Sequence, residues 1–163
     1  MPTILPPPQQ GIARRIASIP LPPYRYIPGI LPHPIRHEGG HLRDQHLVFE
    51  VTEPWWEDQG WLYGQDLFDH RFYWESHEVW EYQWKQTASI SHRYLLQALI
   101  KSAASILKRH MNHQRPAELL WGSAQKLFAL VGEETRGLDI EVCVARIECF
   151  HQGGAWPLLA SRP

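Results

Sequence analysis

The chain contains little cysteine and no long apolar run, and each of these shortages excludes certain classes of protein. Cys143 and Cys149 are the only cysteines, so there is no disulfide framework and no Cys-x-x-C metal or redox motif. No stretch approaches the roughly 18 apolar residues of a membrane-spanning helix, and the first ten residues do not resemble a signal peptide. We therefore expect a cytoplasmic protein with no membrane partner.

An excess of charge of one sign is also lacking. The 17 acidic and 16 basic residues leave a net charge of -1, which gives no electrostatic basis for binding nucleic acid. Histidine and tryptophan are abundant instead, with ten and eight copies among 163 residues. That length suits one domain with a sizeable core. The composition is compatible with a small-molecule ligand and with a homo-oligomer.

Proline is unevenly distributed and divides the chain. Ten of the fourteen prolines precede residue 35, where they recur too often for a long helix. We interpret residues 1–11 as a flexible tail and residues 12–57 as an extended arm that packs on the body, because this arm is rich in isoleucine, leucine and tyrosine. A floppy linker is the alternative. Residues 58–151 are predicted to form the bundle domain, and residues 152–163 a C-terminal tail.

Helical spacing dominates from Trp61 onward. Helices are predicted at about 58–70, 72–86, 92–111, 116–131 and 138–150. Ser89 or Ser91 could cap the third helix, Pro116 suits the first position of the fourth, and Gly132 could cap its end.

The connections between these helices are short, which is typical of antiparallel neighbours. We predict an all-α fold, an antiparallel bundle of four to five helices with an extended Pro-rich N-terminal arm. Residues 46–52 are the only strand candidate. His92, His113 and His151 are expected at the surface.

The segment His37–His41, HEGGH, matches the zinc-protease pattern H-E-x-x-H. That pattern binds zinc because a helix places its two histidines one turn apart on one face. Here Gly39 and Gly40 each cost a helix about 1 kcal/mol, and Pro34 lies just upstream. We interpret the segment as a loop and reject the protease motif, although His41 remains a candidate ligand.

A second histidine motif lies on the second predicted helix, in WESHEVWEYQW from Trp74 to Trp84. At roughly 100° per residue, His77 and Glu81 fall within one stripe of aromatic side chains. Its members are Tyr73, Trp74, Trp80 and Trp84. Such a stripe is normally the buried face of a helix. Burying an ionised carboxylate there is unfavourable unless it is paired or binds a metal.

Three interpretations of this helix stay open. In the first, His77 and Glu81 form a buried structural hydrogen-bond network. In the second, they hold a divalent metal ion of unspecified identity, with Glu78 as a further ligand or as the general base of a metal-dependent hydrolase. In the third, the tryptophans wall a metal-free pocket for a small polar ligand. His33 and His41 on the arm are candidate additional metal ligands, and Gln97 and Lys101 on the third helix could complete the polar site.

The stretch from Asp66 to Trp84, followed by LLQALI and an LKRHMN turn, resembles the helical family known as domain of unknown function 309. The matching residues of the second helix are Phe68, Tyr73, Glu75, His77, Glu78, Glu81 and Trp84. The arm resembles one branch of that family in its YRY, PG, PHP and GH elements, which contain His33 and His41. The resemblance covers about residues 20–131 and implies an all-helical bundle.

No established activity comes with this family, although its members are often described as predicted metal-dependent hydrolases on the basis of the motif. The chain departs from the family pattern at the third helix, where Ala98 and Lys101 replace the usual glycine and second glutamine. An ammonium group at position 101 would repel a metal ion and would suit an anionic ligand. The alternative to a hydrolase is a non-enzymatic structural or ligand-binding helical protein.

Overall fold

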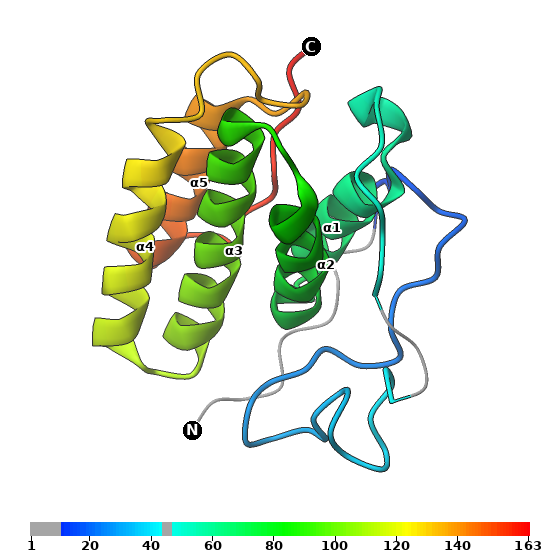
Figure 1. The fold of residues 1–163 in the computed structure, drawn as a ribbon. Helices are drawn as coiled ribbons and strands as arrows, with labels where there is room; N and C mark the ends of the chain where they lie inside the picture. Colours follow the sequence, from blue (N-terminus) through cyan, green and yellow to red (C-terminus); the bar gives the residue numbers. More distant parts are fainter. Residues whose placement is uncertain (1–10, 44–46) are drawn as a thin grey trace.

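Five α-helices form the body of this computed structural model, which describes residues 11–43 and 47–163 (Figure 1). In chain order the elements are the 3-10 turn η1 (Trp55–Glu57) and helices α1 (Gln59–Asp69), α2 (Tyr73–Gln86), α3 (Ile90–His110), α4 (Gln114–Phe128) and α5 (Ile140–His151). Within the described ranges the only β pairing is an isolated antiparallel bridge between Leu138 and Ser161. The all-α prediction is confirmed. The predicted strand is absent over residues 47–52, and residue 46 lies outside the described residues.

Three helices begin at a residue whose side chain accepts a backbone N–H of the first turn. These caps are Asp58 for α1, Ser89 for α3 and Asp139 for α5. Such a bond satisfies one of the N–H groups that a helix leaves without an internal partner. Ser91 does not cap α3, because its hydroxyl donates to the carbonyl of Val131 instead.

Helix α4 is displaced relative to the prediction. It begins at Gln114, so Pro116 occupies its third position, where the missing N–H would have had no partner within the helix. It ends at Phe128 rather than near residue 131. Gly132, with a φ of +66°, lies in the turn beyond and does not cap the helix directly.

The core runs through the middle of the bundle. Helix α2 packs between α1 and α3, and α3 packs against α4; Figure 1 shows α5 behind this pair. Trp61 and Trp80 are fully buried with ring centroids 6.3 Å apart, and Phe68 lies 6.1 Å from Trp80. The main aromatic core therefore joins α1 and α2, which carry most of the aromatic residues that lie in helices.

Residues 12–43 of the arm contact α1 through partly buried ion pairs. The side chain of Arg14 donates to Asp66 at 3.0 Å, and that of Arg15 donates to Asp69 at 2.7 Å. The backbone N–H of Leu159 donates to the same Asp69 at 2.7 Å, so the C-terminal segment and the arm meet at one carboxylate. The predicted tail, residues 1–11, lies outside the described residues except for its last position.

His92 was expected at the surface, and this expectation is wrong. Its side chain is fully buried on α3, where Nδ1 lies 3.0 Å from the hydroxyl of Thr87 and the ring meets Trp61 edge-on. Burial lowers the pKa of His92 to about 3, and the charge of Arg136 contributes in the same direction.

This burial predicts a loss of stability in acid. A histidine whose folded pKa is depressed contributes stability above its unfolded pKa, near 6.5, and loses it as the pH falls. Between pH 7.5 and pH 5 we expect this residue alone to lower the free energy of unfolding by about 2 kcal/mol. Urea denaturation of wild type and His92→Gln at both pH values would measure it. Parallel losses in the two proteins would contradict the prediction.

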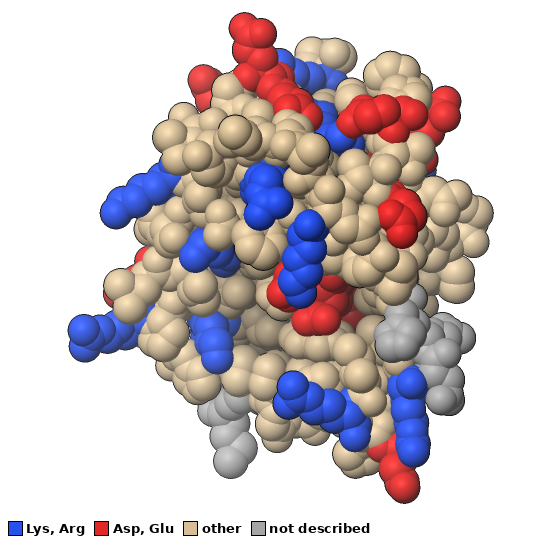
Figure 2. All heavy atoms as spheres, in the orientation of Figure 1, with Lys and Arg blue, Asp and Glu red and all other residues tan. Residues whose placement is uncertain are grey.

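The surface mixes both signs of charge. Figure 2 shows basic and acidic side chains interspersed on one face, with an acidic group near its centre. Within residues 11–43 and 47–163, no helix is long and apolar enough to span a membrane. The absence of a one-signed surface on this face agrees with the near balance of acidic and basic residues in the sequence.

Candidate functional site

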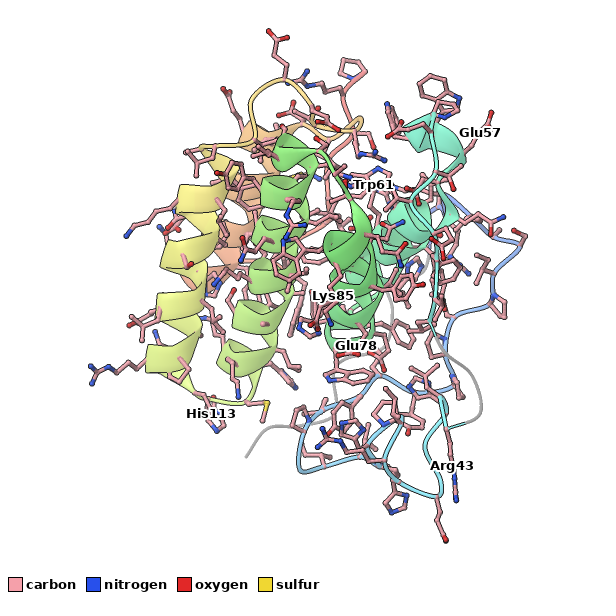
Figure 3. The ribbon with its side chains drawn as sticks, viewed as in Figure 1. Arg43, Glu57, Trp61, Glu78, Lys85 and His113 are labelled. Carbon is pink, nitrogen blue, oxygen red and sulfur yellow. The ribbon has the colours of Figure 1, made fainter. Side chains whose placement is uncertain are left out.

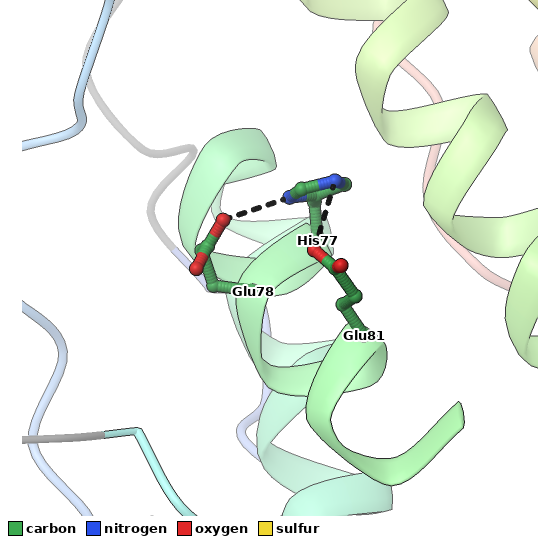
Figure 4. Close-up of side chains that lie close together, drawn as sticks. All are labelled: His77, Glu78 and Glu81. Atoms are coloured by element: carbon green, nitrogen blue, oxygen red, sulfur yellow. Dashed lines mark ion pairs between the residues drawn. The ribbon is translucent and has the colours of Figure 1, made fainter. Parts of the chain in front are cut away.

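Three polar side chains of α2 converge on its outer surface (Figure 4). The ring nitrogen Nδ1 of His77 lies 3.3 Å from Oε1 of Glu78, and Nε2 lies 3.7 Å from Oε2 of Glu81. One ligand atom from each residue falls within 4.8 Å of the other two. Among the described residues, no other group of three or more histidine, cysteine, aspartate or glutamate side chains has such spacing. We refer to His77, Glu78 and Glu81 as the His–Glu cluster.

The His–Glu cluster is accessible to solvent. The exposed fractions of its side chains are 28% for His77, 31% for Glu78 and 35% for Glu81. Lys85 donates to Glu81 at 2.9 Å, one turn along the helix. This hydrogen bond is the main cause of the lowered pKa of Glu81, so that carboxylate is ionised at neutral pH.

The prediction that His77 and Glu81 are buried is wrong. The buried face of α2 carries Tyr73, Glu75, Ser76, Val79, Trp80 and Gln83. At roughly 100° per residue, the middle of that face lies about 120° from His77. The predicted stripe treated Trp74, Trp80 and Trp84 as equally buried, whereas only Trp80 is fully buried. The buried face is centred on Ser76, Val79 and Gln83, so it points away from the His–Glu cluster.

The aromatic residues assigned to a pocket lie in three different environments. Tyr73 and Trp80 belong to the core, where Tyr73 packs against Phe68. Trp74 is half-buried under the arm, and Trp84 is half-buried beneath the guanidinium of Arg93. These side chains lie in different environments, and a pocket that they would wall together around the His–Glu cluster remains a prediction.

Gln97 and Lys101 are half-buried on α3. In the part of the chain that the structure describes, no hydrogen bond or ion pair joins either residue to the His–Glu cluster. The cation that pairs with Glu81 is Lys85, from the same helix. A role of Gln97 and Lys101 in the site therefore remains a prediction.

The arm histidines reach α2 at other positions. Nε2 of His41 lies 3.1 Å from Oε1 of Glu75, which is fully buried. His33 packs its ring on Trp74, and its Nδ1 accepts the backbone N–H groups of Ile35 and Arg36. Neither histidine is part of the His–Glu cluster. The structure therefore brings the arm to α2 without adding the predicted ligands.

Glu75 is the buried carboxylate of α2, and no role was predicted for it from the sequence. Its Oε1 accepts the backbone N–H of Tyr26 at 2.9 Å and faces His41, while its Oε2 has no hydrogen-bond partner. Burial raises the pKa of Glu75, and the hydrogen bond from His41 acts in the opposite direction. At about 100° per residue, Glu75 lies on the same face of α2 as the apolar Val79, and this spacing could have predicted its burial.

A cleft of about 150 Å³ lies beside the His–Glu cluster, between α2 and the arm. Figure 3 labels Glu78 and Lys85, which both come from α2. The polar wall comes from Glu78, Glu81, Tyr82 and Lys85, and the apolar wall from Ile35, Leu42, Leu47 and Val48. Two of the three cluster residues therefore also line the cleft.

Comparison with known proteins gives one match. No curated protein and no solved structure matches the chain. The arm, residues 12–57, was predicted to resemble one branch of domain of unknown function 309, and it lies outside the residues that this comparison matches. Residues 61–120, which span α1, α2, α3 and the start of α4, match the family model "Domain of unknown function (DUF309)", so the resemblance of the helical body to that family is confirmed.

Proposed function

We propose that the His–Glu cluster binds a divalent transition-metal ion on the outer face of α2. The observation that carries this proposal is the spacing of its three ligand atoms, all within 4.8 Å of one another. Ligands of one Zn²⁺ ion lie about 2.0–2.2 Å from it, so small side-chain rotations would bring these atoms to bonding distance. Their partial exposure leaves room for such rotations and for entry of the ion.

The donor set supports a particular group of metals. One imidazole nitrogen and two carboxylate oxygens suit Zn²⁺, Mn²⁺, Fe²⁺ or Ni²⁺ better than Ca²⁺ or Mg²⁺, which prefer oxygen ligands alone. All three ligands come from a single helix, so coordination positions would stay open to water, as in catalytic rather than structural sites. This arrangement supports a site that exchanges its metal readily.

Metal-dependent hydrolysis is the activity that we propose for this site. A bound ion supplies a water of lowered pKa and polarises a carbonyl or phosphoryl group. Glu78 and Glu81 both line the cleft, but Glu81 pairs with Lys85, so the Glu78 oxygen that does not ligate the ion would accept a proton from water. A cytoplasmic location, favoured by the free thiols of Cys143 and Cys149, remains part of this proposal.

A non-enzymatic role is the second candidate, and one observation favours it. The two ring nitrogens of His77 face different carboxylates, and Glu81 already pairs with Lys85. Such a chain of surface charges needs no ion. Exposed pairs of this kind contribute about 0–1 kcal/mol, so a purely structural role predicts a small effect on stability and no metal affinity.

We expect purified wild-type protein to bind one Mn²⁺ or Zn²⁺ per chain in isothermal titration calorimetry. Substituting His77 by alanine removes the nitrogen ligand and should weaken binding by at least about tenfold. His113→Ala, an exposed histidine before α4, is the matched control and should bind the metal like wild type. Equal affinities in all three proteins, or no binding in wild type, would contradict the metal site.

A further inference from the structure

The cleft between α2 and the arm has two walls of opposite character. On the α2 side lie two carboxylates, a phenol and an ammonium group, from Glu78, Glu81, Tyr82 and Lys85. On the arm side lie only aliphatic side chains, from Ile35, Leu42, Leu47 and Val48. Ile35 and Val48 are 41% and 48% exposed, so they present apolar surface to solvent inside this cleft. A ligand with one polar and one apolar end would contact both walls.

The charge of the polar wall depends on the proposed metal. Glu78, Glu81 and Lys85 together carry a charge of -1, because two carboxylates face one ammonium group. Adding a divalent ion changes this sum to +1. Lys85 is exposed, and the ammonium group of an exposed lysine is positively charged at neutral pH. The cleft therefore attracts anions only when the ion is bound.

The size of the cleft limits the ligand. Its volume of about 150 Å³ is below the roughly 300–1,000 Å³ of sites for drug-sized molecules. A nucleotide exceeds this volume, whereas a carboxylate with a short alkyl chain fits within it. The aliphatic wall offers no hydrogen-bond donors or acceptors from its side chains, which disfavours a phosphate or a polyol in that half.

We propose that the metal-loaded cleft binds short-chain aliphatic carboxylates. The carboxylate lies toward Glu78, Glu81 and Lys85, where the ion and the ammonium group provide its positive partners. The alkyl chain lies along Ile35, Leu42, Leu47 and Val48. This inference rests on the proposed metal site for the anion, and it specifies the chemistry of the ligand, a short acyl group, that the proposed hydrolase would recognise.

The test titrates acetate, propionate, butyrate, valerate and hexanoate into protein saturated with Mn²⁺, again by isothermal titration calorimetry. Each added methylene should raise the affinity about two- to fourfold until the apolar wall is covered. Metal-free protein should bind butyrate at least about tenfold more weakly, because the sign of the charge in the cleft is reversed. Butylammonium, the cationic analogue, should show the opposite preference.

A matched pair of arm variants tests the apolar wall. Ile35→Thr should weaken valerate binding about three- to tenfold. Ile30→Thr changes the same residue type on the same arm at 39% exposure, outside the cleft, and should bind within twofold of wild type. Both side chains are exposed, so neither variant should lose its fold.

The outcomes separate the two proposals. If wild type fails to bind Mn²⁺, the proposed function fails and the carboxylate site falls with it. The carboxylate site is overturned, and the metal site stands, if Mn²⁺ binds through His77 but the affinity for carboxylates does not depend on the length of their alkyl chain. The same conclusion follows if Ile35→Thr and Ile30→Thr bind valerate equally well.

Discussion

Substituting Glu75 by alanine is expected to lower the free energy of unfolding by about 3–5 kcal/mol. Glu75 is fully buried, and its Oε1 receives both the backbone N–H of Tyr26 and Nε2 of His41. Removing the carboxylate leaves two buried groups of the arm without their partner, and each carries a desolvation penalty. The loss should appear in urea denaturation at pH 7.

The arm should also detach more readily in Glu75→Ala. Arg36 and Arg43 are exposed trypsin sites on the segment that Glu75 anchors through His41. We therefore expect faster cleavage at both arginines than in wild type, because local opening of the arm needs less free energy. This readout separates loss of arm docking from a general loss of helical stability.

Glu81→Ala is the control on the same helix. Glu81 is 35% exposed and pairs with Lys85 at the surface, so its removal should change stability by no more than about 0.5 kcal/mol. The loss of stability in Glu75→Gln should lie between those of Glu75→Ala and Glu81→Ala, because the amide oxygen still accepts the backbone N–H of Tyr26. Similar losses in Glu75→Ala and Glu81→Ala would show that Glu75 does not hold the arm.

The substitution Gly64→Ala is expected to destabilise the protein by about 3 kcal/mol. Gly64 lies in α1, where an added Cβ would be 2.5 Å from Cε2 and 2.7 Å from Cδ1 of Trp80. Trp80 is fully buried between Trp61 and Phe68, so its ring cannot move away without displacing the aromatic core. The clash outweighs the roughly 1 kcal/mol that alanine gains over glycine within a helix.

Gly122→Ala provides the opposite expectation within the same fold. Gly122 lies in α4, and no other atom would come within 4 Å of its added Cβ. The helix propensity of alanine is therefore unopposed, and stability should rise by roughly 0.5–1 kcal/mol. Thermal denaturation of both variants would measure the difference. A stabilised Gly64→Ala would mean that Trp80 does not pack against α1 as closely as the structure shows.

Features that depend on neighbouring residues in one helix were predictable from the sequence. The helices from α1 to α5 lie within a few residues of their expected ranges, because apolar spacing and caps such as Ser89 act locally. The grouping of His77, Glu78 and Glu81 was predictable for the same reason, since Glu81 lies three positions after Glu78 and four after His77, and side chains at these spacings are neighbours on a helix.

The burial of α2 was not predictable in the same way. The sequence of α2 contains two plausible apolar faces, because tryptophans occur at Trp74, Trp80 and Trp84. Contact with α1 and α3 selects the face of Trp80 and Val79. That choice places Glu75 inside and the His–Glu cluster outside, which is the opposite of the environment predicted for His77 and Glu81.

The sequence by itself determined the five helices, the all-α class and the ligand types of the candidate metal site, because periodicity and capping depend on residues within a few turns. Only the tertiary structure decided that His41 reaches Glu75, 34 residues away, and that the arm supplies the apolar wall of a cleft beside Glu78 and Glu81. These contacts join segments with no local relation, and their geometry follows from how the whole core packs.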